Sequence, residues 1–228
     1  MTVFQLCNEL IFPPPEFSER DGLLAIGGDL RVERLLLAYS KGIFPWYSDN
    51  WPILWWSPDP RLILIPEELR VSRSLKQTIR KGFFTATMDR AFEEVIWNCS
   101  DVHRKEDDGT WITDDMADAY VALHHAGYAH SIESWHDGKL AGGLYGVSLG
   151  SAFFGESMFT KISDASKVAF TRLVRQLKAW NFTLIDCQVT TRHLTSFGAR
   201  QVLRSRFLAM LTDALQTPTR KGKWDFSL

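Results

Sequence analysis

The stretch AHSIESWHDGKLAGGLYGVSLGSAFFG, Ala129 to Gly155, decides the fold expected for this chain. Turn residues divide it into three strand-like segments, Ala129–Trp135, Lys139–Ser148 and Ser151–Gly155. Because the connections are short, we expect these strands to pair antiparallel as a meander. A long helical pattern, Ala165–Trp180, and one more strand, Thr183–Val189, follow the meander.

Other regular elements are expected from Leu62 onward. The further strands are Leu62–Ile65 and Phe84–Met88, and the further helices are Ser72–Lys81, Arg90–Cys99, Asp114–Ala126 and Thr190–Phe197. Interspersed helices and strands predict an α+β protein with a mixed sheet. Antiparallel strands, a long helix and then a strand are the order of an acetyl-CoA-dependent N-acetyltransferase. We therefore expect a catalytic domain of that (GNAT-like) type over residues 62–228.

Residues 1–61 are expected to form a small, irregular N-terminal domain rich in Pro, Gly and Trp. They contain one credible helix, Leu30–Lys41, with Asp29 as its N-cap and Gly42 as its stop. We expect the rest of this region, including the sequence GGDL at residues 27–30, to be loop.

Four of the nine tryptophans lie within GIFPWYSDNWPILWWSPDPR, from Gly42 to Arg61. Its prolines interrupt both helical and strand periodicity. A rigid loop that carries flat rings can stack on a nucleobase, or its rings can fill a core beneath the loop. Trp111 stands where a polar loop, Asp101 to Asp108, leads into a helix capped by Thr113. It is a candidate second ring for a base held between two indoles.

Composition is that of a soluble globular protein, with 45% hydrophobic residues, 23% charged residues and a net charge of −1. Any nucleic-acid contact must therefore come from a local patch. Three scattered cysteines, Cys7, Cys99 and Cys187, fit a reducing cytoplasm better than a disulfide framework. The six histidines do not stand at metal-ligand spacing, so no metal site is expected. Neither a signal peptide nor a membrane span is visible, and we expect a monomer.

The segment from Arg70 to Lys81 carries five cations and no acid. On a helix, Arg73, Lys76 and Arg80 fall on one side, and Val71, Leu75 and Ile79 fall on the opposite side. Such a run is often only a solvated face. Because no acid interrupts it, it can also bind the phosphates of a nucleic acid without reading their sequence.

Three polar residues stand in otherwise apolar strands. Glu156 follows Gly155, and the apolar segment Leu184–Val189 contains Asp186 and Gln188. Strict alternation would place Asp186 and Gln188 on one face and Ile185, Cys187 and Val189 on the other. A carboxylate in a core strand is either paired structurally or functional. We expect Glu156, Asp186 and Gln188 to meet at one edge of the sheet.

Motifs that bind nucleotides are missing from the sequence. It contains no GxxxxGK[ST], GxGxxG or GxSxG pattern. The segment ESMFTKISDASK, where an acetyl-CoA-dependent enzyme carries its glycine-rich pyrophosphate loop, has no glycine. An ordinary acetyltransferase is therefore disfavoured. A non-catalytic RNA-binding module would explain the rings and the cations but not the three polar strand residues.

Several segments resemble those of the bacterial leucyl/phenylalanyl-tRNA–protein transferases. The matching segments are GLLAIGGDL (residues 22–30), GIFPWYS and ILWWSPDPR (42–61), GTWIT (109–113), AHSIE (129–133), GGLYGVSLG (142–150), FFGESMF (153–159), DASK (164–167) and LIDCQV (184–189). The resemblance spans residues 4–210 and implies a transferase. Such an enzyme moves Leu, Phe or, less readily, Met from aminoacyl-tRNA to proteins that begin with Arg or Lys, and so marks them for the bacterial N-degron pathway.

The resemblance also implies a role for individual residues. Trp46 and Trp111 would hold the terminal adenine of tRNA, and the acceptor stem would lie along Arg73, Lys76, Arg80 and Lys81. The amino-acid side chain would enter a pocket formed by Leu144, Phe153, Phe170, Leu173, Leu177 and Ile185. Asp186 and Gln188 would orient the attacking amine, and Glu156 would bind an amino group or the acceptor's cationic side chain. An aminoacyl ester is already activated, so no cofactor is expected.

Overall fold

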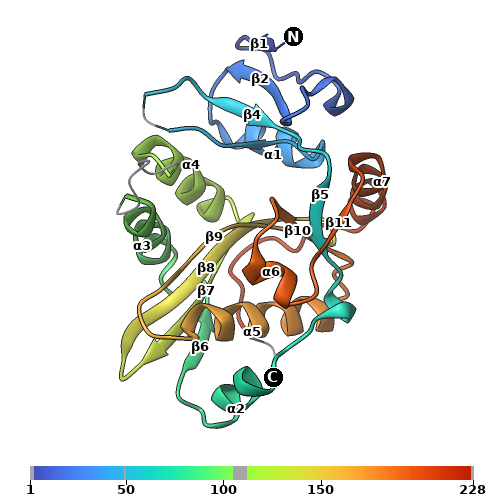
Figure 1. Cartoon of the computed structure of the whole chain (residues 1–228). Coiled ribbons are helices and arrows are strands. Elements are labelled where there is room, and N and C mark those ends of the chain that lie inside the picture. Colours follow the sequence, from blue (N-terminus) through green and yellow to red (C-terminus); the bar gives the residue numbers. More distant parts are fainter. Residues whose placement is uncertain (1–2, 49, 105–111, 227–228) are drawn as a thin grey trace.

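The structure, a computed structural model, describes residues 3–48, 50–104 and 112–226, and the side chains of residues 102–104 lie outside this description. Two sheets organise the chain (Figure 1). A small sheet of order β1-β2-β4-β3 belongs to the N-terminal region, and a seven-stranded sheet has the order β11-β5-β10-β9-β8-β7-β6. The expected α+β class with mixed sheets is confirmed.

The N-terminal region is more regular than expected. It contains β1 (Phe4–Leu6), β2 (Leu23–Gly27), β3 (Phe44–Pro45) and β4 (Leu54–Trp56). The expectation of loop outside one helix was therefore wrong. The backbones of β2 and β4 pair across about thirty residues of chain, a contact that no local pattern announces. Helix α1 (Val32–Ser40) begins later than expected, with Arg31 as its N-cap residue. Asp29 instead accepts a hydrogen bond from the Arg31 backbone and pairs with Arg31 and Arg34.

The large sheet is built on the expected meander. Strands β7 (Ala129–His136), β8 (Lys139–Leu149) and β9 (Ala152–Thr160) pair antiparallel in sequence order. Strand β9 extends five residues past the expected end at Gly155, because its second half continues to pair with β8. Strand β6 (Thr85–Met88) adds to the β7 edge. Strand β10 (Leu184–Gln188) pairs parallel to β9, and β5 (Arg61–Leu64) pairs antiparallel to β10.

Helices cover both faces of this sheet. Helix α5 (Ala165–Ala179) packs on one face, against β7, β8 and β9. Helices α3 (Phe92–Arg104) and α4 (Asp114–His125) pack on the opposite face, and α1 contacts α4 and β8 there. Two apolar cores result, one on each side of the sheet. The core beside α3 and α4 continues into the small sheet, so both sheets share apolar packing.

Side-chain caps fix two helices where the sequence placed them. Ser72 accepts a hydrogen bond from the Leu75 backbone at the start of α2 (Arg73–Arg80), and Thr113 caps α4 in the same way. Helix α3 instead runs five residues past Cys99, so the expected loop begins too early. Among the described residues, no helix is both long and apolar enough to cross a membrane.

The C-terminal part contains one expected helix and two elements that the sequence patterns did not reveal. Helix α6 (Arg192–Ser196) lies within the expected helix Thr190–Phe197. The two missed elements are β11 (Arg200–Val202), which joins the β5 edge, and α7 (Arg204–Ala214), which packs against β5 and β10. Gly42, which ends α1 with a φ of +70°, lies against this helix. A Cβ atom there would stand 2.7 Å from the Phe207 ring, so both backbone shape and space require glycine.

Candidate functional site

A cavity of about 510 Å³ opens between β9, β10, α5, α6 and β3. Most of its wall is apolar. Five of the six residues expected to form an amino-acid pocket line it: Leu144, Phe153, Phe170, Leu173 and Ile185. The sixth, Leu177, was expected to line the pocket but does not reach its wall. It is fully buried in the same core, one turn further along α5. An apolar side chain can enter this space and gain the usual benefit of leaving water.

Trp46 stands at the mouth of the cavity with 42% of its surface exposed. Its position is fixed by the backbone: its N–H donates to the Leu54 carbonyl at 3.0 Å, and its carbonyl accepts from the Trp56 indole at 2.7 Å. The Trp46 and Trp56 rings lie 5.8 Å apart at a tilt of 60°. The Trp46 indole is therefore partly open to solvent beside the cavity. The second expected ring, Trp111, lies outside the described residues.

The tryptophan-rich stretch contains both buried and exposed rings. Trp55 is fully buried against Phe12, and its indole donates to the Gly27 carbonyl at 2.8 Å. Trp51, by contrast, is 65% exposed. Along β4, Trp55 is buried and its neighbour Trp56 is only partly buried, as alternation along a strand predicts.

Glu156 and Gln188 form the polar end of the cavity. The Gln188 side-chain amide donates to Glu156 Oε1 at 2.9 Å, and the Tyr120 hydroxyl donates to Glu156 Oε2 at 2.8 Å. The Tyr120 hydroxyl is in turn hydrogen-bonded to the Tyr39 hydroxyl. The carboxylate is thus held by neutral donors. The two tyrosines come from α4 and α1, and both are fully buried.

Burial is the main influence on the protonation of Glu156. It raises the pKa of this carboxyl to about 7, while hydrogen bonds from Tyr39 and Tyr120 act in the opposite direction. The negative charge of Asp186 raises the pKa as well, and the Gln188 hydrogen bond lowers it. The pKa values of Tyr120 and Tyr145 are raised well above the ordinary value, mainly by the burial of their own hydroxyls and secondly by the negative charge of Glu156. Glu156 is therefore poised to exchange a proton near neutral pH.

Asp186 occupies a different environment, although it lies only two residues from Gln188. It is fully buried and accepts two hydrogen bonds from the Arg61 guanidinium, at 2.8 and 2.6 Å. That guanidinium is sandwiched between the rings of Phe44 and Phe207, at 4.7 and 4.6 Å. Asp186 is not part of the cavity wall. Its carboxylate thus forms a buried ion pair with Arg61.

Gln188 departs from the alternation expected along β10. Its φ is +58°, and the pairing of β10 with β5 shifts register between Asp186 and Gln188. The prediction that Gln188 and Cys187 face opposite sides was wrong, because this irregularity turns both toward the cavity. Asp186 Oδ1 accepts the Gln188 backbone N–H at 2.9 Å and so holds the unusual conformation.

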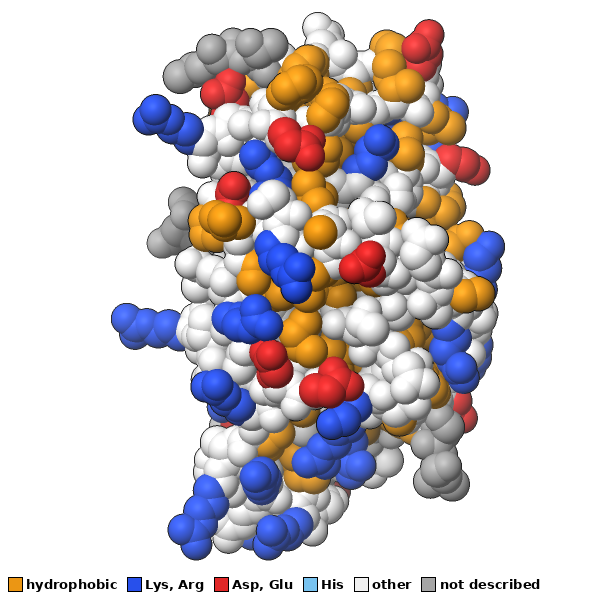
Figure 2. Space-filling model, turned by 90° about the vertical axis from the view of Figure 1, so that its right-hand side faces the viewer, with side chains coloured by type: hydrophobic (Ala, Val, Ile, Leu, Met, Phe, Trp, Pro, Cys, Tyr) orange, Lys and Arg blue, Asp and Glu red, His pale blue; other side chains and the backbone are white. Residues whose placement is uncertain are grey.

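The cationic side of α2 is exposed as expected. Arg73, Lys76, Arg80 and Lys81 all face solvent, whereas Leu75 is buried and Val71 and Ile79 pack partly into the core. Within the part of the chain that the structure describes, none of the four cations forms a salt bridge. Figure 2 shows Lys and Arg side chains gathered at the lower end of the molecule, the end at which α2 lies in Figure 1.

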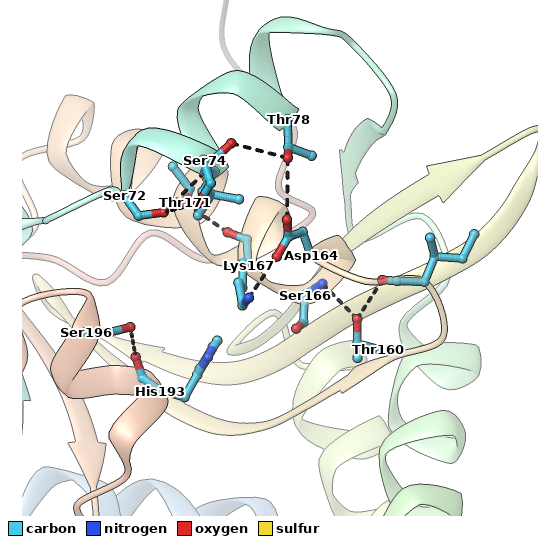
Figure 3. A network of polar contacts seen from close by, with 12 residues as sticks. Ser72, Ser74, Thr78, Thr160, Asp164, Ser166, Lys167, Thr171, His193 and Ser196 are labelled. Carbon is cyan, nitrogen blue, oxygen red and sulfur yellow. Dashed lines mark hydrogen bonds and ion pairs between the residues drawn. The ribbon is translucent and has the colours of Figure 1, made fainter.

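A polar network ties α2 to the wall of the cavity (Figure 3). Thr78 on α2 donates to Asp164 at 3.4 Å, and Lys167 on α5 pairs with the same carboxylate at 2.7 Å. Ser166, beside them on α5, lines the cavity. His193 lies across from them on α6, and burial followed by the charge of Lys167 lowers its pKa. The cationic helix therefore has a fixed position relative to the cavity.

Three residues of this site were not identified from the sequence. Arg61 is hydrogen-bonded to a residue 125 positions away, and Tyr39 to one 81 positions away. The only sequence signal for Arg61 was Asp186, because an aspartate in a core strand requires a partner. Nothing local distinguished Tyr39 or Tyr120 from other core tyrosines.

Comparison with known proteins identifies relatives over nearly the whole chain. Residues 63–212 match the family model described as leucyl/phenylalanyl-tRNA protein transferase, and residues 28–59 match the model for its N-terminal domain. A leucyl/phenylalanyl-tRNA–protein transferase of Syntrophobacter fumaroxidans is 58% identical over 99% of this chain and 96% of its own length. Similar proteins from Anaeromyxobacter sp. (strain Fw109-5) and Myxococcus xanthus are 59% and 55% identical, over 99% and 98% of this chain and 96% and 97% of their own lengths.

Proposed function

This chain belongs to the leucyl/phenylalanyl-tRNA–protein transferase family, and we propose that its cavity is where the aminoacyl group is transferred. The enzyme transfers leucine or phenylalanine from aminoacyl-tRNA to the N-terminus of a protein. The observation that supports the location is one continuous cavity with an exposed indole at its mouth, an apolar wall and a polar end.

The donor fits this cavity in one direction. The terminal adenine of the tRNA stacks on Trp46, with Trp111 as its second ring, and the leucyl or phenylalanyl side chain lies against Phe153, Phe170 and Ile185. Methionine, an unbranched apolar side chain of similar volume, also enters. The acceptor stem then follows Arg73, Lys76, Arg80 and Lys81, which the Asp164 network holds beside the cavity.

The polar end serves the incoming amine. Peptide-bond formation from an ester requires a neutral amine held against the carbonyl carbon, and the ester itself supplies the driving force. Gln188 donates its amide N–H to Glu156, which leaves its carbonyl oxygen as the acceptor for an amine hydrogen. Asp186 supports this arrangement by holding the backbone of Gln188 and does not touch substrate. The reaction uses no cofactor.

The acceptor and the wider architecture complete the proposal. We assign acceptors that begin with Arg or Lys, whose new N-terminal residue marks them for the N-degron pathway, and a monomeric enzyme in the cytoplasm. Antiparallel β7, β8 and β9, followed by α5 and a parallel β10, support a GNAT-like domain. The two family models meet between residues 59 and 63, which supports a small domain over 1–61 and a catalytic domain over 62–228.

A transfer assay tests this function. Phenylalanyl-tRNA carrying radiolabelled phenylalanine is incubated with the enzyme and with peptides that differ only in their first residue. Label should appear on peptides beginning with Arg or Lys and not on an alanine-initiated control. Label that stays on the tRNA in the presence of folded enzyme would contradict the proposal. Label on every peptide would remove the acceptor preference alone.

A further inference from the structure

The polar end of the cavity continues inward as a chain of hydrogen bonds whose direction is fixed. An ionised carboxylate only accepts hydrogen bonds, so Tyr120 must donate to Glu156. The Tyr120 oxygen is then free to accept the hydrogen bond from Tyr39. On the other side, Gln188 Nε2 donates to Glu156 Oε1. Every donor in this chain points toward Glu156.

The groups around Glu156 distinguish it from an ordinary buried acid. Those that face it are Tyr39 from α1, Tyr120 from α4, Tyr145 from β8, and Asp186 and Gln188 from β10. Arg61 is already engaged by both oxygens of Asp186. Among the residues that the structure describes, no Lys, Arg or His side chain therefore forms a salt bridge with Glu156. It nevertheless lines the cavity and is only half-buried.

We propose that Glu156 is the proton acceptor of the transfer reaction, and that Tyr39 and Tyr120 are positioning residues that hold its carboxylate through their hydroxyls. This inference rests on the proposed function, because it assigns a role within the same cavity. It gives α1 of the N-terminal region a direct part in the catalytic site. Tyr39 supplies that part through its hydroxyl, which is hydrogen-bonded to the Tyr120 hydroxyl that donates to Glu156.

The proton balance of the reaction requires such a group. The acceptor's α-ammonium carries three protons, and the amide nitrogen that it becomes carries one. The Glu156 carboxylate first accepts one proton from the ammonium, which leaves a neutral amine, and then releases this proton to solvent. As the amine forms the C–N bond and the bond from the acyl carbon to the ribose oxygen breaks, the second proton goes to the ribose oxygen that leaves. An amide such as Gln188 is too weak a base to accept the first proton.

The electrostatics of the site agree with this role. Burial raises the pKa of Glu156 to about 7, near the pH at which a general base works best. Because the tyrosine hydroxyls lower this pKa, removing either one should raise it. Tyr128 supplies a control: it packs against the same apolar core as Tyr39 and Tyr120, but it does not line the cavity.

The test compares single-turnover transfer from phenylalanyl-tRNA to an arginine-initiated peptide between pH 5.5 and 8. Glu156→Gln should lower the rate about 100-fold or more. Tyr120→Phe and Tyr39→Phe should lower it less and move the acid limb of the profile to higher pH. Tyr128→Phe should leave rate and profile unchanged. The acceptor's own amine contributes the same limb to every variant, so any difference between variants arises from the enzyme.

Two outcomes would overturn the inference: a Glu156→Gln enzyme within a few-fold of the parent, or an acid limb that stays in place in both folded Tyr→Phe variants. Circular dichroism establishes that each variant is folded. If a Tyr→Phe variant does not fold, ¹³C NMR of glutamate-labelled parent enzyme decides, with Glu156 assigned by its loss in Glu156→Gln. A carboxyl that titrates near its ordinary value contradicts the inference. Failure of the parent enzyme to transfer at all would instead refute the proposed function.

Discussion

Two carboxylates in the neighbouring strands β9 and β10 have opposite surroundings. Asp186 is fully buried, accepts two hydrogen bonds from the Arg61 guanidinium and lies off the cavity. Glu156 lines the cavity and is held by a tyrosine hydroxyl and an amide. A buried acid that is hydrogen-bonded to a cation forms an ion pair that fixes the structure around it. An acid held by neutral donors keeps its ability to titrate near neutral pH.

The two acids act on the same residue from two sides. Asp186 fixes the backbone of Gln188 in its left-handed conformation, and Glu156 fixes the orientation of its side-chain amide. Residues with φ in this region cost free energy, so such a conformation persists where its surroundings enforce it. The ion pair thus supplies rigidity and the neutral cluster supplies chemistry. Each of the following predictions would break or sharpen this division.

The largest effect is expected from Arg61→Met. This change leaves Asp186 buried without a counter-ion, which should lower the free energy of unfolding by about 3–5 kcal/mol in urea titrations. Arg200→Met is the matched control, because its salt bridge to Glu68 at 3.1 Å is half exposed, and it should cost no more than about 1 kcal/mol. The double variant Arg61→Met/Asp186→Leu should recover much of the loss. Equal effects for Arg61 and Arg200 would remove the structural role assigned to the ion pair.

Trp46→Ala should have the next largest effect, on activity. If the Glu156 end of the cavity is where the donor reacts, loss of stacking should raise the free energy of the transition state by about 1–3 kcal/mol. This change would be measured as a lower kcat/KM for phenylalanyl-tRNA. Trp51→Ala is the control, since Trp51 is even more exposed but does not line this cavity. Equal losses in the two variants would show that the indoles contribute through packing rather than through this site.

The difference between local and distant contacts explains which elements of the fold could be predicted from the sequence. Helix α2 and the meander β7 to β9 depend on periodicity and turns within short segments, and the structure confirms them. Strands β2 and β4 depend on pairing with one another across a gap in sequence, and they were missed.

The site follows the same rule. Glu156 and Gln188 stood out because polar residues in apolar strands are unusual, and the structure brings them together. Their supporting residues, Arg61, Tyr39 and Tyr120, belong to other elements and carry no distinguishing local pattern. The left-handed Gln188 escaped because alternation assumes a regular strand, and a register shift is not visible in residue types.

A smaller effect is expected in the pH dependence of stability. Folding raises the pKa of Glu156 from 4.5 to about 7, so its contribution to stability is fully present below pH 4.5 and is lost as pH rises through 7. Glu156→Gln removes this titration. Its stability relative to the parent should therefore rise between pH 4.5 and 7, on the order of 1 kcal/mol because the carboxylate faces the cavity.

Urea titrations of both proteins at several pH values measure this difference. Buried His130, whose pKa is lowered, destabilises the fold as pH falls below 6.5, but it contributes equally to both proteins and cancels. A difference that stays constant with pH would mean that Glu156 does not titrate in this range, and the contrast with Asp186 would disappear.

The smallest effect on stability is expected where cations have no acid at all. Arg73 and Lys76, unlike the buried Arg61, are exposed on α2 and have no salt-bridge partner among the described residues. Changing both to Ala should therefore alter the free energy of unfolding by less than about 0.5 kcal/mol. Their effect should appear in binding instead. Each phosphate contact that is lost should reduce the slope of log K against log salt by roughly 0.7–0.9.

Binding of uncharged tRNA at several salt concentrations measures this slope. Arg206→Ala, which removes an exposed cation on α7, a helix that lies apart from α2 in Figure 1, should leave it unchanged. An unaltered slope in the α2 variant would show that its cations are only a solvated face. A reduced slope with unchanged stability would complete the contrast: a buried, paired arginine stabilises the fold, whereas exposed and unpaired cations are free to bind phosphate.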